Sequence, residues 1–215
     1  MKVLFIGKKD DERAETAAEY LRSKFTDCEI IFGQRKDKFP DFFKSWSGDY
    51  IFSYLSPWII SKTLLLNASS GAINWHPGPP EYPGIGCTNF AIYNNEKVFG
   101  ITCHYMKAKV DTGKIIEVRR FPVTAEDGVF SMTQNCYSEI LSSFKFIIDK
   151  IVNNETLPES KEHWTRVPYT RKELDALCEI KPDMSPEETK KRIKATTYDR
   201  PWAFTQIHGI KFYLK

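Results

Sequence analysis

Short apolar runs alternate along the first 150 residues with segments in which apolar residues recur every three or four positions. The runs predict β-strands at residues 2–6, 28–32, 50–54, 72–76, 98–110 and 114–121. The helical spacing predicts helices at residues 10–25, 39–46, 57–66 and 88–93, and a long helix capped by Thr124 that extends to about residue 151. Strands that alternate with helices are typical of an α/β fold with a mainly parallel sheet. The Asp-Thr-Gly turn between the last two strands predicts a hairpin, and hence a mixed sheet.

The pattern weakens at residues 153–160, where we place a domain boundary, with a core at 1–155 and a C-terminal extension at 156–215. In the extension, the sequence SPEE at 185–188 is typical of a capping box with proline at the first helical position. It predicts a short basic helix to about residue 195. Two β-prone runs, 202–207 and 210–214, flank a His-Gly pair and predict a terminal hairpin.

The composition fits one compact domain with a small appendage. The chain has 215 residues, of which 41% are hydrophobic and 14% aromatic, so a sizeable core can form. No apolar run approaches the roughly 18 residues that span a bilayer, and the start MKVLFIGKKDDE turns acidic too early for a signal peptide. The five cysteines form no C-x-x-C pair, which disfavours a disulfide framework and a zinc site and favours a reducing cytoplasm.

The net charge of +3 is too small to indicate a nucleic-acid partner by itself. Its placement is more informative, because residues 161–215 hold 12 Lys and Arg against 8 Asp and Glu. Such a basic C-terminal quarter can meet phosphate, an anionic partner, or only water.

Residues 71–113 carry the candidate chemistry. Side chains alternate along a strand, so Asn74 and His76 share one side of the run at 72–76, which breaks at Pro77. Ligands of open α/β sheets bind beyond the carboxyl ends of the strands, where this pair would lie. Taken alone, His76 is more often a structural histidine, and Asp111 is a common turn residue. An amide donor, a titratable base and a carboxylate at strand ends of one sheet together favour catalysis.

The spacing of these motifs resembles a known family. N-x-H-P about 35 residues before V-D-T-G is the pattern of formyltransferases that use N10-formyltetrahydrofolate. The strings INWHPGPPEYPGIGCTNFAIYN, GITCHYM and VDTGKII are most similar to the nucleotide-sugar N-formyltransferases, which formylate amino-deoxysugars for surface polysaccharides of the O-antigen type in lipopolysaccharide. The close match covers roughly residues 50–122. It implies a Rossmann-like, mainly parallel sheet flanked by helices, with a small C-terminal helix and β-hairpin extension.

The resemblance implies that Asn74, His76 and Asp111 are catalytic. Attack of a sugar amine on a formyl carbon places negative charge on oxygen, to which the Asn74 amide can donate as in an oxyanion hole. His76 can stabilise that oxygen or take a proton from the amine, and Asp111 can orient His76 or relay the proton through water. The division of proton transfer between His76 and Asp111 stays open. This chemistry needs no metal, and we expect none.

The resemblance also implies where the two substrates bind. The folate slot of the family matches residues 53–60 and 105–111, so the expected folate contacts are Leu55, Ser56, Trp58, Ile59, Tyr105, Lys107 and Val110. For Leu55 and Ile59, ordinary core packing explains the apolar residue equally well. The segment after His76 should shape the sugar pocket, with expected contacts from Pro79, Tyr82, Gly84, Thr88 and Asn89. In the basic extension, the expected nucleotide contacts are Trp164, which could stack on a base, Arg166, Tyr169 and Arg171.

Several acceptors and one other class of function stay open. The first choice is dTDP-4-amino-4,6-dideoxyglucose; GDP-perosamine, a UDP sugar or a 3-amino sugar are alternatives. Glycinamide ribonucleotide formylation would need a Gly-rich phosphate loop after the first strand, where Gly7 is the single glycine, and the same lack of G-x-G-x-x-G disfavours a nicotinamide site. The residues after the boundary are too few for the tRNA-binding domain of methionyl-tRNA formyltransferase. A nonenzymatic folate- or sugar-binding module is disfavoured by the intact Asn74, His76 and Asp111.

The terminal hairpin predicts a homodimer. A lone two-stranded hairpin is marginal in water and leaves open edges, so it must pack on its own domain or on a second chain. The small sugar formyltransferases that this chain resembles are commonly dimeric through C-terminal elements, which favours the second chain. We expect a cytoplasmic protein with a nucleotide-sugar substrate and no membrane or nucleic-acid partner.

Overall fold

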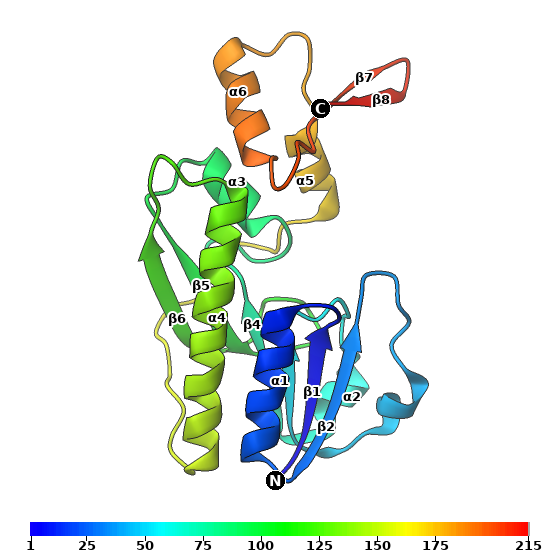
Figure 1. Ribbon diagram of the computed structural model, residues 1–215, viewed down its shortest axis with the longest axis vertical. Coiled ribbons are helices and arrows are strands. Elements are labelled where there is room, and N and C mark those ends of the chain that lie inside the picture. Colours follow the sequence, from blue (N-terminus) through cyan, green and yellow to red (C-terminus); the bar gives the residue numbers. More distant parts are fainter. Residues whose placement is uncertain (215) are drawn as a thin grey trace.

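The computed structural model describes residues 1–214, and a six-stranded sheet organises them (Figure 1). Its strands, in the spatial order β2-β1-β3-β4-β5-β6, are β1 (Lys2–Lys8), β2 (Asp27–Gly33), β3 (Gly48–Tyr54), β4 (Ala68–His76), β5 (Val98–Tyr105) and β6 (Ile115–Pro122). Neighbours from β2 to β4 pair in parallel, whereas β5 pairs antiparallel with both β4 and β6. The mixed, mainly parallel sheet that the sequence predicts is confirmed.

Helices cover both faces of this sheet. On one face, α1 (Glu12–Lys24) and α4 (Val129–Val152) lie side by side (Figure 1). The short η1 (Asp41–Ser45) and α2 (Lys62–Leu66) cover the other face, where Leu64 joins a second apolar cluster with Trp46. None of the helices formed by residues 1–214 is both long and apolar enough to cross a membrane.

An aromatic cluster fixes the orientation of β4. Phe144 of α4 is fully buried, and its ring lies 4.9 Å from the ring of Trp75 and 5.3 Å from that of Tyr54. Trp75 therefore points into the core beneath α4. Because side chains alternate along a strand, Asn74 and His76 on either side of it point to the opposite face of β4.

The extension after α4 packs on α3 (Cys87–Tyr93), and its elements are α5 (Arg171–Cys178), α6 (Pro186–Ala195), β7 (Phe204–Ile207) and β8 (Ile210–Tyr213). Helix α5, which the apolar pattern does not predict, begins at a reciprocal cap: the Thr170 hydroxyl accepts from the Glu173 N–H, and the Glu173 carboxylate accepts from the Thr170 N–H. Helix α6 begins at the predicted position, with Pro186 first and the Ser185 hydroxyl accepting from the Glu188 N–H. The predicted capping box is not completed, because the Glu188 carboxylate accepts from Tyr93 and Arg192 instead. The division at residue 155 stays a prediction.

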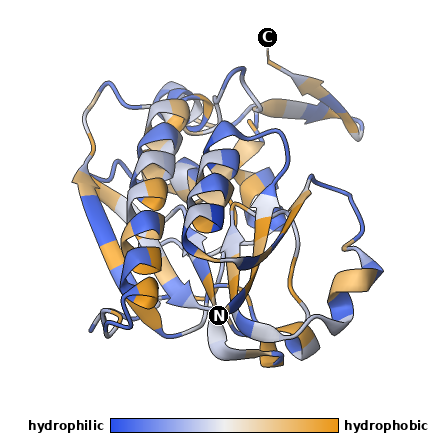
Figure 2. Ribbon diagram, turned by 60° about the horizontal axis from the view of Figure 1, so that its bottom comes forward, coloured by the Kyte–Doolittle hydropathy of each residue, from blue (hydrophilic) through white to orange (hydrophobic). Residues whose placement is uncertain are grey.

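The terminal hairpin is present as predicted. β7 and β8 pair antiparallel around a turn in which His208 and Gly209 have φ angles of 50° and 81°. Figure 2 shows the hairpin standing apart from the body of the molecule, with hydrophobic as well as hydrophilic positions along it. Its exposed apolar side chains are Ile207, Ile210, Phe212, Tyr213 and Leu214.

Several element boundaries differ from those expected: strand β4, for example, begins at Ala68 rather than at residue 72. Helix α2 is shorter and begins after Ser61, whose hydroxyl accepts from the N–H three residues on. Helix α4 begins after Gly128 rather than after Thr124, because the hydroxyl and N–H of Thr124 bond to the carboxylate of Asp127 and form a turn. Strand β5 ends at Tyr105, because the chain then turns back and completes the site described next.

Candidate active site

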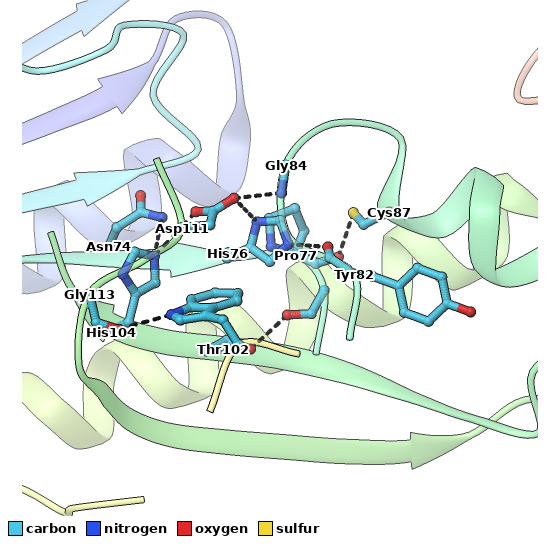
Figure 3. Close-up of polar contacts among 12 residues, drawn as sticks. Asn74, His76, Pro77, Tyr82, Gly84, Cys87, Thr102, His104, Asp111 and Gly113 are labelled. Atoms are coloured by element: carbon cyan, nitrogen blue, oxygen red, sulfur yellow. Dashed lines mark hydrogen bonds and ion pairs between the residues drawn. The ribbon is translucent and has the colours of Figure 1, made fainter. Parts of the chain in front are cut away.

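Strands β4 and β5 bring three polar side chains together. Asn74 and His76 lie two residues apart on β4, and the antiparallel register pairs Asn74 with His104 of β5. Figure 3 shows both imidazoles beside the carboxylate of Asp111. His76, His104 and Asp111 are only 4%, 2% and 5% exposed, so this is a buried cluster of ionisable groups.

Asp111 reaches the cluster from the turn after β5. Its φ of 47° is left-handed, a conformation that Asp tolerates better than most residues. Two residues on, a Cβ at Gly113 would lie 1.6 Å from the carbonyl oxygen of Tyr105, so only glycine fits. The turn that directs the carboxylate at the histidines thus suits Asp at 111 and requires glycine at 113.

The Asp111 carboxylate contacts three segments of the chain. Its Oδ2 lies 3.3 Å from Nδ1 of His76, and its Oδ1 lies 3.4 Å from Nε2 of His104. The backbone N–H of Gly84 donates to Oδ2 at 2.7 Å. One carboxylate therefore ties together β4, β5 and the Pro-Gly loop that follows β4.

The partners of the ring nitrogens indicate how each imidazole is oriented. Nε2 of His76 lies 2.8 Å from the carbonyl oxygen of Tyr82, which can only accept, so the ring donates there. Nδ1 of His104 likewise donates to the next residue's carbonyl at 2.8 Å, which leaves its Nε2 to accept from the Asn74 amide at 3.2 Å. In each neutral ring, the nitrogen that faces Asp111 therefore carries the lone pair, and a proton on it would lie beside the carboxylate.

The charge state of Asp111 follows from its neighbours. Burial acts to raise the pKa of this carboxyl, but it is outweighed by the positive charge of His76 and His104 in their protonated forms, by a hydrogen bond from His104 and by the N–H of Gly84, which together lower the pKa to about 2. Asp111 is therefore ionised at neutral pH. Such a carboxylate can hold an imidazolium in place, but it is not a proton donor.

His104 is a site residue that the sequence analysis did not assign. The signal was present in the string GITCHYM, seven residues before Asp111. Whether His104 belongs to the site depends on which residue of β4 lies opposite it in the sheet. That register is set by the pairing of the two strands and cannot be predicted from a local pattern.

A cavity of about 430 Å³ opens over this cluster. Asn74, His76, His104 and Asp111 form one side of it. Six of the seven predicted folate contacts also line it, namely Leu55, Ser56, Trp58, Ile59, Lys107 and Val110. The seventh, Tyr105, contributes the carbonyl that accepts from His104 instead.

A second cavity of about 400 Å³ adjoins the first. The two share Pro77, Ile85 and Tyr137. Three predicted acceptor contacts line the second cavity: Thr88, Asn89 and Arg171. Two further residues, Arg35 and Trp202, also line it. Arg35 lies in the turn after β2 and Trp202 at the start of the terminal hairpin, and neither was predicted from the sequence to bind a substrate.

The other three residues predicted to contact the sugar lie in the Pro-Gly loop and determine its conformation. The Tyr82 side chain points away from the cluster (Figure 3), and its hydroxyl donates to Glu96 at 2.6 Å. Its backbone carbonyl is the group that holds His76. The Pro79 carbonyl accepts from the Tyr82 N–H, and Gly84 lines the first cavity rather than the second.

The remaining predicted nucleotide contacts lie elsewhere. Trp164 and Arg166 line a third, open groove of about 740 Å³ beside the Asp-Thr-Gly turn. The Arg166 guanidinium pairs with Glu173 at 2.9 Å and lies over the ring of Tyr169, which in turn stacks on Phe90 at 3.8 Å. Arg166 and Tyr169 thus already have partners within the chain, and their assignment to a nucleotide stays a prediction.

Comparison with known proteins places this site in a family. Residues 7–139 match the formyl transferase family. Methionyl-tRNA formyltransferase of Alkaliphilus oremlandii is 31% identical over 156 residues, which cover 70% of this chain and 48% of the relative. That of Listeria innocua is 37% identical over 75 residues, 34% of this chain and 24% of the relative. The chain spans less than half the length of these curated relatives.

Solved structures agree over the whole chain. A sugar N-formyltransferase from Shewanella superposes with a TM-score of 0.79 at 20% identity, covering 100% of this chain and 96% of that one. A 4-N formyltransferase from Francisella tularensis gives 0.79 at 20% identity, covering 99% and 96%. The N-formyltransferase of Helicobacter canadensis, solved with folinic acid and dTDP-3-aminofucose, gives 0.73 at 20% identity, covering 98% and 86%. The fold is shared with these enzymes and, since the family match covers more than half of the sequence, the chain belongs to the formyl transferase family.

Proposed function

We propose that this protein transfers the formyl group of N10-formyltetrahydrofolate to the amine of a nucleotide-linked amino-deoxysugar, with dTDP-4-amino-4,6-dideoxyglucose as the first-choice acceptor. The observation that carries the proposal is the position of the buried cluster of Asn74, His76, His104 and Asp111. All four residues line the first cavity, and Pro77, which directly follows His76, lines both the first and the second cavity. A donor and an acceptor could therefore meet at this cluster from two separate sites.

The first cavity suits the folate. Leu55, Trp58 and Ile59 give it an apolar lining that suits a flat ring system, and Asn74 and His104 add polar groups to the same lining. Bound there, the co-substrate supplies an electrophilic formyl carbon. Folinic acid in the Helicobacter canadensis structure supports this choice of donor.

The side chains of the cluster can then take separate roles in the transfer. The Asn74 amide has two N–H donors; one is directed to His104, and the other is available for an oxygen that gains negative charge. In their neutral forms, His76 and His104 can each take a proton from the attacking amine, directly or through water, as the new C–N bond forms. The same proton can then be given to the leaving nitrogen of the folate as its bond to the formyl carbon breaks. Ionised Asp111 stabilises the imidazolium that results. The burial of the cluster strengthens each of these interactions because it lowers the local dielectric.

The second cavity suits a nucleotide sugar. Arg35 and Arg171 both line it, and guanidinium groups favour the bidentate recognition of phosphate oxygens. Trp202 offers a ring on which a base can stack. The dTDP sugar in the Helicobacter canadensis structure supports a thymidine nucleotide, and GDP or UDP sugars remain the alternatives.

The deciding experiment incubates the protein with N10-formyltetrahydrofolate and a panel of dTDP-, GDP- and UDP-linked 3-amino and 4-amino sugars. Mass spectrometry should detect one added formyl group on a member of the panel, and absorbance should report release of tetrahydrofolate. Glycinamide ribonucleotide and methionyl-tRNA serve as competing acceptors. Formylation of either of these, with no turnover of any amino sugar, would overturn the proposal.

We further propose a homodimer that forms through the terminal hairpin, and a place in the cytoplasm. Phe212 and Tyr213 are 52% and 62% exposed, large apolar surfaces for so short a hairpin. A second copy of the chain would cover them across a two-fold axis. The cysteines of the described chain are free thiols, which suits a reducing compartment.

A further inference from the structure

Trp164 lies against the catalytic cluster from a segment distant in sequence. Its ring centroid is 5.1 Å from that of His104 and 5.8 Å from that of His76, and both contacts are edge-on. Yet Trp164 is not among the residues that line the first or the second cavity within residues 1–214. The indole thus supports the two imidazoles on a side that neither substrate is proposed to occupy.

The indole N–H makes a second connection. It donates to the carbonyl oxygen of Gly113 at 2.8 Å, two residues after Asp111. One side chain therefore contacts both histidines and holds the turn that supplies the carboxylate. The predicted role of Trp164, stacking on a nucleotide base, is hard to combine with a ring already placed in this way.

The segment around Trp164 is itself anchored. The Thr165 N–H donates to the Pro80 carbonyl, and the Tyr169 N–H donates to the Pro83 carbonyl. These bonds fasten residues 164–169, which we call the strap, to the loop whose backbone holds His76. These bonds thus hold the strap in the position in which the indole contacts the two imidazoles.

We propose that Trp164 is a positioning residue that holds His76, His104 and the Asp111 turn in the geometry required for formyl transfer. Its ring blocks rotation of both imidazoles and excludes water behind them, and its N–H fixes the turn. The kinetic part of this inference rests on the proposed function, whereas the geometric part does not.

The kinetic test compares Trp164→Ala and Trp164→Phe with the control Val167→Ala, an exposed position on the same strap. Displacement of catalytic groups by about 1 Å can cost on the order of 10²-fold in rate. We expect kcat to fall about 10²-fold for Trp164→Ala, and about 10-fold for Trp164→Phe, which keeps a ring but lacks the N–H. KM for both substrates should change by less than about threefold, because the indole lines neither cavity. Val167→Ala should match the wild type.

A second readout needs no turnover. The chain has four histidines, of which His163 and His208 are exposed, so the two buried rings can be assigned by ¹⁵N NMR. At a pH at which both rings are neutral, the wild type should show a proton on Nε2 of His76 and on Nδ1 of His104, and Trp164→Ala should replace these by averaged tautomers. Unchanged tautomers in a folded Trp164→Ala protein would overturn the inference. So would a kcat within threefold of wild type, or a loss that appears only in KM. If no amine is ever formylated, the proposed function fails and the NMR comparison still decides the role of Trp164.

Discussion

The backbone N–H of Gly84 donates a 2.7 Å hydrogen bond to Oδ2 of Asp111. This contact gives the carboxylate a donor that does not titrate. It also joins the loop after β4 to the turn after β5. A Cβ at Gly84 would lie 2.4 Å from the Tyr169 carbonyl oxygen, so this backbone approach requires glycine. Asp111 therefore keeps its place whichever imidazole is protonated during a reaction cycle.

His76→Ala, Asp111→Ala and Asn74→Ala should each lower kcat by on the order of 10²–10³. His76→Ala removes a proton-transfer group from the buried cluster, Asp111→Ala removes the counter-charge to that group, and Asn74→Ala removes an amide donor. Steady-state formylation assays give the rates, and near-UV circular dichroism checks the fold. The matched control is His208→Ala in the exposed terminal turn, which should retain wild-type kcat. A His76→Ala protein with more than about a tenth of wild-type activity would refute the mechanism, since a lost acid–base group costs at least that much.

Asp111 should also make the fold sensitive to acid. Its pKa is lowered from 3.8 to about 2 in the folded chain, so it stabilises the fold fully above about pH 4 and loses this effect as the pH falls through about 2. A shift of this size corresponds to roughly 2 kcal/mol in the free energy of unfolding. Urea unfolding of the wild type and Asp111→Asn at pH 7 and pH 2.5 measures it. The stability difference between the two proteins should shrink at the lower pH, and an unchanged difference would contradict the assignment. Asp183→Asn, at an exposed position, controls for general charge effects.

Arg35→Ala and Arg171→Ala should each raise KM for the nucleotide sugar by about 10-fold with little change in kcat, because phosphate contacts contribute similarly to ground and transition states. KM for the folate should not change. Arg166→Ala is the comparison that decides where the nucleotide binds: its guanidinium pairs with Glu173, so we expect less than a twofold effect. A large effect of Arg166→Ala with none at Arg35 would move the nucleotide to the third groove.

The full chain should be a dimer at micromolar concentration, and a chain that ends at Thr197 should be a monomer. The truncation removes the hairpin and its exposed apolar side chains. Light scattering and sedimentation velocity measure both masses. The milder variant Phe212→Lys with Tyr213→Lys keeps the backbone and should also dissociate the dimer. A truncated chain that stays dimeric would show that another surface forms the interface.

The sequence sufficed for those features that local rules determine. Alternation alone puts Asn74 and His76 on one face, and the Asp-Thr-Gly string identifies the turn of Asp111. His104 needed the register of β5 against β4, which depends on pairing across the sheet. Helix α5 was missed because a polar capping box sets its start, and only Leu174, Leu177 and Cys178 in it are buried.

Binding contacts were harder to predict than catalytic ones for a related reason. Arg35 and Trp202 are far apart in sequence and meet at the second cavity only through the tertiary fold. Trp164 and Arg166 look like an exposed aromatic and basic pair in the sequence. In the structure each is already engaged, one by Gly113 and the other by Glu173.

The pairing of Asn74 with His104 in adjacent strands has an evolutionary consequence. Adding one residue to β4 or β5 would turn every following side chain to the other face and dismantle the chemistry at once. Residues 85–97 between the two strands lie outside this pairing: they form α3 and its flanks, and the lining of the second cavity includes Ile85, Gly86, Cys87, Thr88 and Asn89. Under the proposed function, the choice of acceptor can therefore change through side-chain substitutions that line the second cavity, while the strand register keeps Asn74 opposite His104.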